Sequence, residues 1–209
     1  MSRPVFILFF LCIISTVAVA ADVPASAEDI CPIKMGAELP QITLTTIEGE
    51  SFDLKAAVSK QPTILIYYRG GWCPFCNMQL GQIEEVYPQL IQLGYQILAV
   101  SPDKPSELKK STETHKLDYT LLSDSKMTGA KALGIAYELQ DYMLDALAEH
   151  NIDLEEASGG ENTNLLPVPA VFILDTKGII HFTYINPNYK IRLNPEVMVT
   201  AAKVVLEEP

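Results

Sequence analysis

Continuous apolar runs alternate along this chain with segments whose apolar residues recur at helical spacing. Three runs are rich in β-branched and aromatic residues and predict strands buried on both faces: TILIYY at 63–68, YQILAVS at 95–101 and YTLLSD at 119–124. Residues 73–94 show a long helical period, and we expect Pro88 to kink or split that helix. Residues 101–117 predict a turn followed by an amphipathic helix.

Hairpin signals lie on both sides of this central part. Residues 41–54 alternate between apolar and polar, and Asp53 is placed to cap a short helix. Further on, PAVFILD at 169–175 and IIHFTYI at 179–185 flank a Thr-Lys-Gly turn and predict a second hairpin. A closing helix is expected to begin with Asn194 as its cap.

The order of these elements predicts the fold class. Strands that alternate with helices indicate an α/β protein with a central sheet covered by helices on both faces. Between the strands we expect a short helix at 125–134, a helical stretch at 139–157 and a loop at 158–164. No repeat and no long linker divides the chain, so we predict one domain at 39–207, preceded by an exposed leader at 21–38.

The first twenty residues have the pattern of a secretory signal peptide. Arg3 is followed by a long apolar run that ends in Ala18-Val19-Ala20, with small residues at the first and third positions. We therefore expect export to the periplasm or the extracellular space, with an uncleaved membrane anchor as the alternative. Removal of residues 1–20 takes away Arg3 and no acidic residue, so the formal charge of −11 becomes −12. Such a surface repels nucleic acid and anionic lipid.

Three cysteines follow the signal segment, namely Cys31, Cys73 and Cys76. Disulfides persist in the oxidising compartments that exported proteins reach, and an odd number of cysteines leaves one thiol without a fixed partner. The simplest interpretation of Cys31 is an incidental free thiol in the leader. Pairing with another chain, or with Cys73 as an alternative resolving thiol, remains open.

Cys73 and Cys76 belong to the stretch YRGGWCPFC at 68–76, where a buried strand ends and a helix begins. A thiol at a helix N-terminus meets unpaired N–H groups and the positive end of the macrodipole, which lower its pKa. Cys76 lies three residues later on the same face, so the pair can close a disulfide and reopen it by thiol exchange. We assign Cys73 and Cys76 to catalysis and the adjacent Trp72 to substrate binding.

Other interpretations of the two cysteines compete with a redox role. A zinc site needs about four ligands, and only Cys31 and the three histidines are left to complete one. A structural disulfide that closes so small a loop would add little stability through chain entropy. Two buried, inert thiols are the third alternative. We expect no metal and no cofactor.

The ordered motifs resemble a known family. Strand–RGGWCPFC–helix, followed later by VPAVFILD, resembles the thioredoxin superfamily. MGAELPQITL near the start, ILAVSPD and LLSD resemble its peroxiredoxin side, the alkyl hydroperoxide reductase and thiol-specific antioxidant group, and most of all the peroxiredoxin-like branch. The resemblance covers about residues 31–205 and implies a thioredoxin-like fold with a central mixed sheet.

Two positions depart from the peroxiredoxin pattern. Gly70 stands where peroxiredoxins usually carry Thr or Ser, three residues before the peroxide-attacking cysteine. Pro169 stands where they carry an arginine that polarises the peroxide. Pro169 instead matches the thioredoxin proline that faces the disulfide, so we assign it to substrate binding and expect a cis Val168–Pro169 bond. We expect Arg69 or Arg192 to supply the missing cation, because the strand ending at 185 returns to the Cys73 end of the sheet.

The resemblance implies two mechanisms that use the same cysteines in the same order. As a thiol peroxidase, Cys73 attacks a hydroperoxide, Cys76 resolves the sulfenic acid, and a thioredoxin-like donor reduces the disulfide. As a protein disulfide reductase, Cys73 attacks a substrate disulfide and Cys76 resolves the mixed disulfide. A non-catalytic binding module on the same fold is the third hypothesis. The sequence leaves the oligomeric state open.

Overall fold

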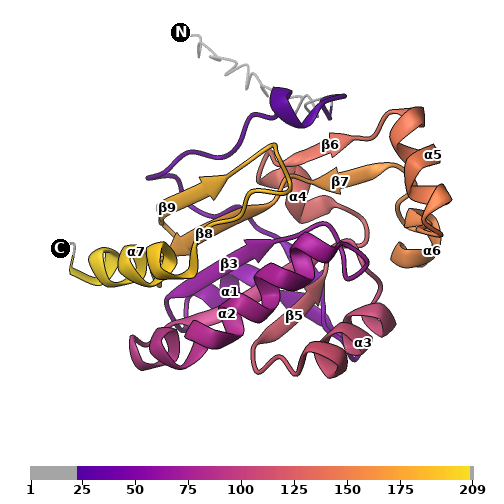
Figure 1. Cartoon of the computed structure of the whole chain (residues 1–209). Helices are drawn as coiled ribbons and strands as arrows, with labels where there is room; N and C mark the ends of the chain where they lie inside the picture. Colours follow the sequence, from indigo (N-terminus) through magenta and orange to yellow (C-terminus); the bar gives the residue numbers. More distant parts are fainter. Residues whose placement is uncertain (1–22, 208–209) are drawn as a thin grey trace, which may run out of the picture.

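The computed structural model describes residues 23–207, so the predicted signal peptide lies outside the described part of the chain. A seven-stranded mixed sheet forms its centre (Figure 1). From edge to edge its strands are β2 (Ser51–Asp53), β1 (Thr43–Thr45), β5 (Thr120–Ser123), β4 (Gln96–Ser101), β3 (Thr63–Tyr67), β8 (Ala170–Leu174) and β9 (Ile180–Ile185). The two predicted hairpins, β1–β2 and β8–β9, both form with antiparallel pairing.

Helices cover both faces of this sheet, as predicted. One face packs against α2 (Pro74–Gln92), α3 (Pro105–His115) and α7 (Pro195–Glu207), and the other against α1 (Leu54–Val58) and α4 (Thr128–Ala132). Every residue of β3 and β8 is buried, which explains why their sequences are continuous apolar runs without alternation. Asp53 caps α1 by accepting a hydrogen bond from the Ala56 N–H at 2.9 Å.

The parallel and antiparallel pairings around β3 decide where a site can form. β3 runs parallel to β4, with Tyr67 beside Val100, and antiparallel to β8, with Tyr67 beside Ala170. The end of β3, the end of β4 and the beginning of β8 therefore meet at the same end of the sheet, which is called the sheet edge below. The segment after β9 returns to that edge, because Ile185 pairs with Ala170.

Helix α2 is not split at Pro88, contrary to one of the two outcomes expected for it. Pro88 lies inside a helix that is continuous for 19 residues. The helix ends at Leu93, and Gly94 takes the left-handed conformation with φ +88° that often follows a helix.

The stretch 139–157 is not one helix. It forms α5 (Asp141–Glu149) and α6 (Leu154–Ser158), because Asn151 turns the backbone with φ +57° and Asp153 begins a new helix by accepting from the Glu156 N–H at 3.0 Å. A two-stranded sheet of β6 (Ala136–Glu138) and β7 (Leu165–Pro167) flanks these helices and was not predicted. Strands of three residues are too short to show a period.

The segment expected as an exposed leader packs onto the domain over residues 23–38. A short 3₁₀ turn, η1 (Ala27–Asp29), lies beside β6, and the Glu138 N–H donates to the Pro24 carbonyl at 2.8 Å. The Ile33 N–H donates to the Leu133 carbonyl at 3.0 Å. Half of the residues in this segment are only partly exposed, so the segment packs against the domain. Within residues 23–207, no helix has the length and apolarity required to cross a bilayer.

Candidate active site

Cys73 begins helix α2 at the sheet edge where β3 and β4 end, as the sequence predicted. Its backbone is extended, with φ −88° and ψ 115°, and its carbonyl accepts from the N–H groups of Cys76 and Asn77 at 3.0 Å each. Pro74 occupies the first turn of the helix, where an N–H group would have no partner. The sulfur of Cys73 therefore lies at the positive end of a 19-residue helix.

The two cysteine thiols have opposite pKa shifts. A hydrogen bond from the Cys76 thiol, together with the charges of Arg69 and Arg192, lowers the pKa of Cys73 to about 6 despite burial. Burial raises the pKa of Cys76 well above its usual value, and the neighbouring Cys73 adds to the rise. The pair is thus a thiolate that accepts a hydrogen bond from a buried thiol, which is the arrangement of an attacking and a resolving sulfur.

Arg192 reaches the pair from the segment after β9, as the topology predicted. Its Nη2 donates to the Cys76 sulfur at 3.2 Å, and its Nη1 donates to Gln79 Oε1 at 2.8 Å. Its Nε donates to the carbonyl of Tyr189 at 2.8 Å. All three nitrogens of the guanidinium are engaged, so the cation is held in one place.

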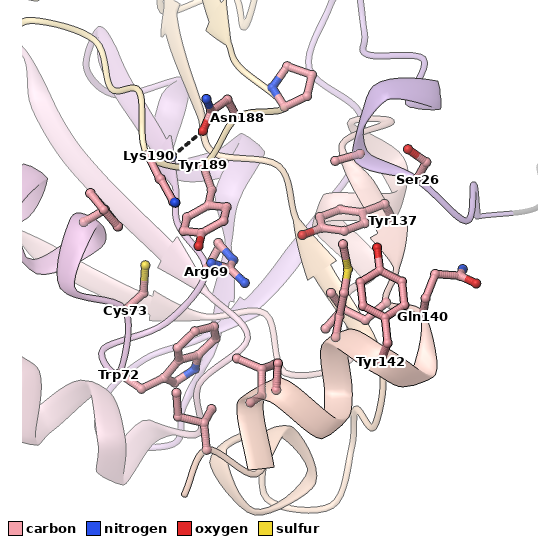
Figure 2. A pocket seen from close by; sticks show the side chains of 18 of the residues that line it. Ser26, Arg69, Trp72, Cys73, Tyr137, Gln140, Tyr142, Asn188, Tyr189 and Lys190 are labelled. Carbon is pink, nitrogen blue, oxygen red and sulfur yellow. Dashed lines mark hydrogen bonds between the residues drawn. The ribbon is translucent and has the colours of Figure 1, made fainter. Parts of the chain in front are cut away.

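Arg69 approaches the site from the loop between β3 and α2. It is only 7 % exposed, and its guanidinium lies between two aromatic rings, 5.0 Å from the centre of Trp72 and 4.0 Å from that of Tyr189. Tyr189 in turn contacts the ring of Phe75 edge to face at 5.8 Å. Figure 2 shows Arg69, Trp72 and Cys73 around one space, with Tyr189 above them.

Asp103 is a component of the site that the sequence analysis did not single out; it lies in the turn predicted at the start of residues 101–117. Its Oδ2 accepts from the N–H of Gly71 at 2.7 Å and from the Ser101 hydroxyl at 3.0 Å, and the side chain is buried. Burial raises the pKa of its carboxyl to about 6. Asn77 holds the other side of Gly71, donating to its carbonyl at 2.8 Å. Asp103 follows β4. Because β4 runs parallel to β3, the ends of both strands lie together, and this pairing could have predicted that Asp103 lies near Cys73.

Gly70 departs from the peroxiredoxin pattern for a steric reason. Its φ is +147°, and a Cβ atom at this position would overlap the indole nitrogen of Trp72 and lie 2.9 Å from Asp103 Oδ1. A threonine or serine therefore does not fit here while Trp72 and Asp103 keep their places.

The expectation of a cis bond before Pro169 is wrong, since residues 23–207 contain no cis peptide bond. The trans chain is held on both sides of the proline. The Val168 N–H donates to the Ile135 carbonyl at 2.8 Å, and Ala170 already pairs with Tyr67 in the sheet. Pro169 directly precedes Ala170, which pairs with Tyr67 at the end of β3, but it is buried and does not line the groove described next.

A groove of about 980 Å³ opens beside Cys73. Its walls come from the loop before α2, the leader, β6, α5 and the segment after β9 (Figure 2). Arg69 and Trp72 line it together with Cys73, whereas Arg192 lies behind the thiol pair and does not. Cys31 is a free, exposed thiol that does not line the groove either. In residues 23–207 no cluster of His, Cys, Asp and Glu is placed to hold a metal ion.

The model of the AhpC/TSA family matches residues 35–183. The chain belongs to this family. Among similar curated proteins, the chloroplastic peroxiredoxin Q of Gentiana triflora is 28% identical over 120 residues, covering 54% of this chain and 55% of the relative. Peroxiredoxin Bcp of Escherichia coli K12 is 28% identical over 104 residues, covering 50% of this chain and 66% of the relative. The chain thus spans between about half and two thirds of these relatives.

Solved structures confirm the thioredoxin-like fold that the resemblance implied. Peroxidoxin BcpB from Mycobacterium tuberculosis superposes with a TM-score of 0.66 at 16% identity, covering 83% of this chain and 98% of that one. Reduced Prx3 from Vibrio vulnificus in complex with H₂O₂ superposes with a TM-score of 0.65 at 18% identity, covering 81% of this chain and 99% of that one. At such identities the likeness concerns the fold.

Proposed function

We propose that this protein is a thiol peroxidase that reduces hydroperoxides through Cys73. The observation that carries the proposal is the pairing of a low-pKa thiol with a buried thiol donor at the start of α2, in a chain of the AhpC/TSA family. At neutral pH a thiol with a pKa of about 6 is mostly thiolate, which is the nucleophilic form.

The reaction proceeds in two displacements. The Cys73 thiolate attacks the terminal oxygen of the hydroperoxide, the O–O bond breaks, and the departing alkoxide takes a proton from water to leave as an alcohol. Cys73 is now a sulfenic acid. The Cys76 sulfur attacks it, a disulfide forms and water leaves. A thioredoxin-like dithiol returns both sulfurs to the reduced state by exchange.

Arg192 supplies a fixed cation on the Cys76 side of the thiol pair. Its guanidinium contacts the Cys76 sulfur and lowers the pKa of both thiols. Deprotonation of Cys76 is the costly part of the second displacement, because that thiol is buried. A fixed cation 3.2 Å from the sulfur favours the charged form at that moment.

Export is the second part of the proposal. The signal-peptide pattern of residues 1–20 supports work in the periplasm or outside the cell, with reducing equivalents supplied by a thioredoxin-like donor of that compartment. The test is expression of the full chain with fractionation of the cells, together with N-terminal sequencing. A mature N-terminus close to residue 21 in the exported fraction supports export, and an intact N-terminus in the cytoplasm contradicts it.

Peroxidase activity is tested by single turnover of the reduced protein with hydrogen peroxide. We expect Cys73→Ser to abolish the reaction. Cys76→Ser should still consume one equivalent of peroxide and stop at a sulfenic acid, which dimedone traps and mass spectrometry locates at residue 73. Consumption of peroxide by Cys73→Ser at the wild-type rate would overturn the assignment.

Protein disulfide reduction is the second candidate, because the same hydrogen-bonded thiol pair performs disulfide exchange. The two activities are separated by measuring the rates with hydrogen peroxide and with insulin disulfides on one preparation. A second-order rate constant for insulin above that for peroxide would favour the reductase.

A further inference from the structure

The groove beside Cys73 is far larger than a small peroxide requires. Its volume of about 980 Å³ lies at the upper end of the range of about 300–1,000 Å³ that is typical of pockets for drug-sized molecules. Hydrogen peroxide has two heavy atoms. The groove therefore has room for an organic body attached to the reacting group.

One wall of the groove is the apolar face of a helix, which packs against the cluster around Tyr137 and Leu166 and stays partly open to the groove. Helix α5 contains no buried residue, and its Met143 and Leu147 line the groove while only half-buried. Tyr142 on the same helix also lines the groove and is 67% exposed. Figure 2 shows Tyr142 on this helix across the space from Cys73. An apolar ligand chain along Met143 and Leu147 would remove this surface from water.

The inner end of the groove holds a buried cation that has no carboxylate partner among residues 23–207. Arg69 is 7% exposed and takes part in no ion pair of residues 23–207, and its Nε has no hydrogen-bond partner there. The Tyr137 hydroxyl oxygen accepts a hydrogen bond from Arg69, but a neutral phenol does not balance the charge of the guanidinium. Within the chain the Cys73 thiolate is the negative charge that Arg69 meets, and the buried Nε still lacks an acceptor. An unpartnered buried donor is costly, so this position favours an acceptor from outside the chain, best of all a charged one.

The charges around the groove agree with an anionic ligand. The chain as a whole carries a formal charge of −11, yet two basic residues, Arg69 and Lys190, line the groove with a single carboxylate, that of Glu28. Glu28 is in the leader, where its carboxylate accepts a hydrogen bond from the Ser26 hydroxyl. The groove is therefore more basic than the protein as a whole.

We propose that the groove binds an organic hydroperoxide that carries a carboxylate close to the peroxide group and an apolar tail. The carboxylate pairs with Arg69, the tail lies along Met143 and Leu147 of α5, and the peroxide reaches Cys73. Because Arg69 and Cys73 line the same inner end, acid and peroxide must lie within a few bonds of each other, as in a 2-hydroperoxy acid. The product is the corresponding 2-hydroxy acid. This proposal rests on the peroxidase function.

Binding is measured without any peroxide, so that it is independent of catalysis. Trp72 is the single tryptophan of the chain and lines the groove, so its fluorescence reports occupancy. The probes are decanoate and its methyl ester. We expect decanoate to bind at least tenfold more tightly than the ester, since a charge-assisted hydrogen bond is worth about that factor. Affinity should rise about threefold per methylene from butyrate to decanoate.

Variants then locate the two contacts. Arg69→Met should bring the acid-to-ester ratio close to one, whereas Lys131→Met, an exposed lysine on α4 outside the groove, should leave the ratio unchanged. Leu147→Ser should weaken the chain-length dependence and keep the acid preference. Equal binding of acid and ester by the wild type, or an acid preference that survives Arg69→Met, would overturn the site.

Turnover completes the test. The rates with 2-hydroperoxydecanoate, its methyl ester and hydrogen peroxide are compared in wild type and Arg69→Met, each variant being referred to its own hydrogen peroxide rate. We expect the wild type to prefer the acid at least tenfold over the ester, and Arg69→Met to lose that preference. Reduction of hydrogen peroxide without an acid preference would overturn this proposal alone. Arg69-dependent decanoate binding with no reduction of any peroxide would overturn the peroxidase function and the hydroperoxide assignment with it.

Discussion

Arg192 lies with its Nη2 3.2 Å from the sulfur of Cys76, although 116 residues separate the two in sequence. The contact joins the segment after the last strand to the first turn of α2. Bonds to Gln79 and to the Tyr189 carbonyl fix the guanidinium in this position. The thiol pair therefore has a cation beside it whose position is fixed by hydrogen bonds within the protein.

Replacement of Arg192 by Met should slow the peroxidase reaction about 10- to 100-fold, because a fixed charge-assisted contact of this kind is worth about 1.5–3 kcal/mol. The measurement is the rate constant of disulfide formation after one equivalent of hydrogen peroxide, since Arg192 contacts Cys76 and acts in the second displacement. Lys203→Met, an exposed change on α7, is the control and should have no effect. An Arg192→Met enzyme with the wild-type rate constant would show that the contact is structural only.

The rate of alkylation of Cys73 should follow its thiolate fraction. With a pKa of about 6, the rate with iodoacetamide should rise through pH 6 and become constant above about pH 7.5. Peptide mapping assigns the modified residue. An inflection near the free-thiol value of about 8.5 would contradict the electrostatic account of the site.

Asp103 is expected to act by positioning the Gly70-Gly71 loop. Asp103→Ala removes the acceptor of the Gly71 N–H, and we expect a loss of peroxidase rate on the order of tenfold, since small displacements near a reacting group are costly. Asp103→Asn keeps an oxygen acceptor and should restore most of the rate. Equal rates for the Ala and Asn variants would show that the hydrogen bond to Gly71 does not matter.

The same carboxyl should affect stability in a pH-dependent way. Its pKa is raised in the folded protein to about 6, so folding favours the protonated form. The stability of the wild type relative to Asp103→Asn should therefore be highest below about pH 4 and fall as the pH rises to about 6. The difference is on the order of 3 kcal/mol. Urea unfolding at pH 4, 5, 6 and 7 measures it, and a pH-independent difference would refute the assignment.

Gly70 and Gly81 should respond in opposite ways to alanine. Gly70→Ala introduces a Cβ that overlaps Trp72 at φ +147°, and we expect a loss of about 1–3 kcal/mol in unfolding free energy and slower peroxide reduction. Gly81 lies inside α2 with open space around its Cα, so Gly81→Ala should be neutral or stabilising by up to about 1 kcal/mol. Chemical denaturation of both variants is the comparison. Equal effects would contradict the steric account of Gly70.

The sequence by itself determined the strands of the core, both hairpins and the place of Cys73 at the start of a helix. These features depend on local chemistry. β3 and β8 are buried on both faces and therefore read as unbroken apolar runs, and Pro74 follows the cysteine because the first helical turn needs no N–H. Even Arg192 could be placed near the site, since alternating strand directions decide which ends meet.

Only the tertiary structure decided how the site is completed. The hydrogen bond from the Gly71 N–H to the Asp103 carboxylate spans 32 residues, and the groove joins the leader, β6, α5 and the segment after β9, which share no sequence pattern. The trans bond before Pro169 and the burial of Arg69 likewise follow from neighbours distant in the chain. Periodicity reports which face of an element is apolar, whereas the partner of that face, and the cavity between two such faces, exist only once the chain has packed.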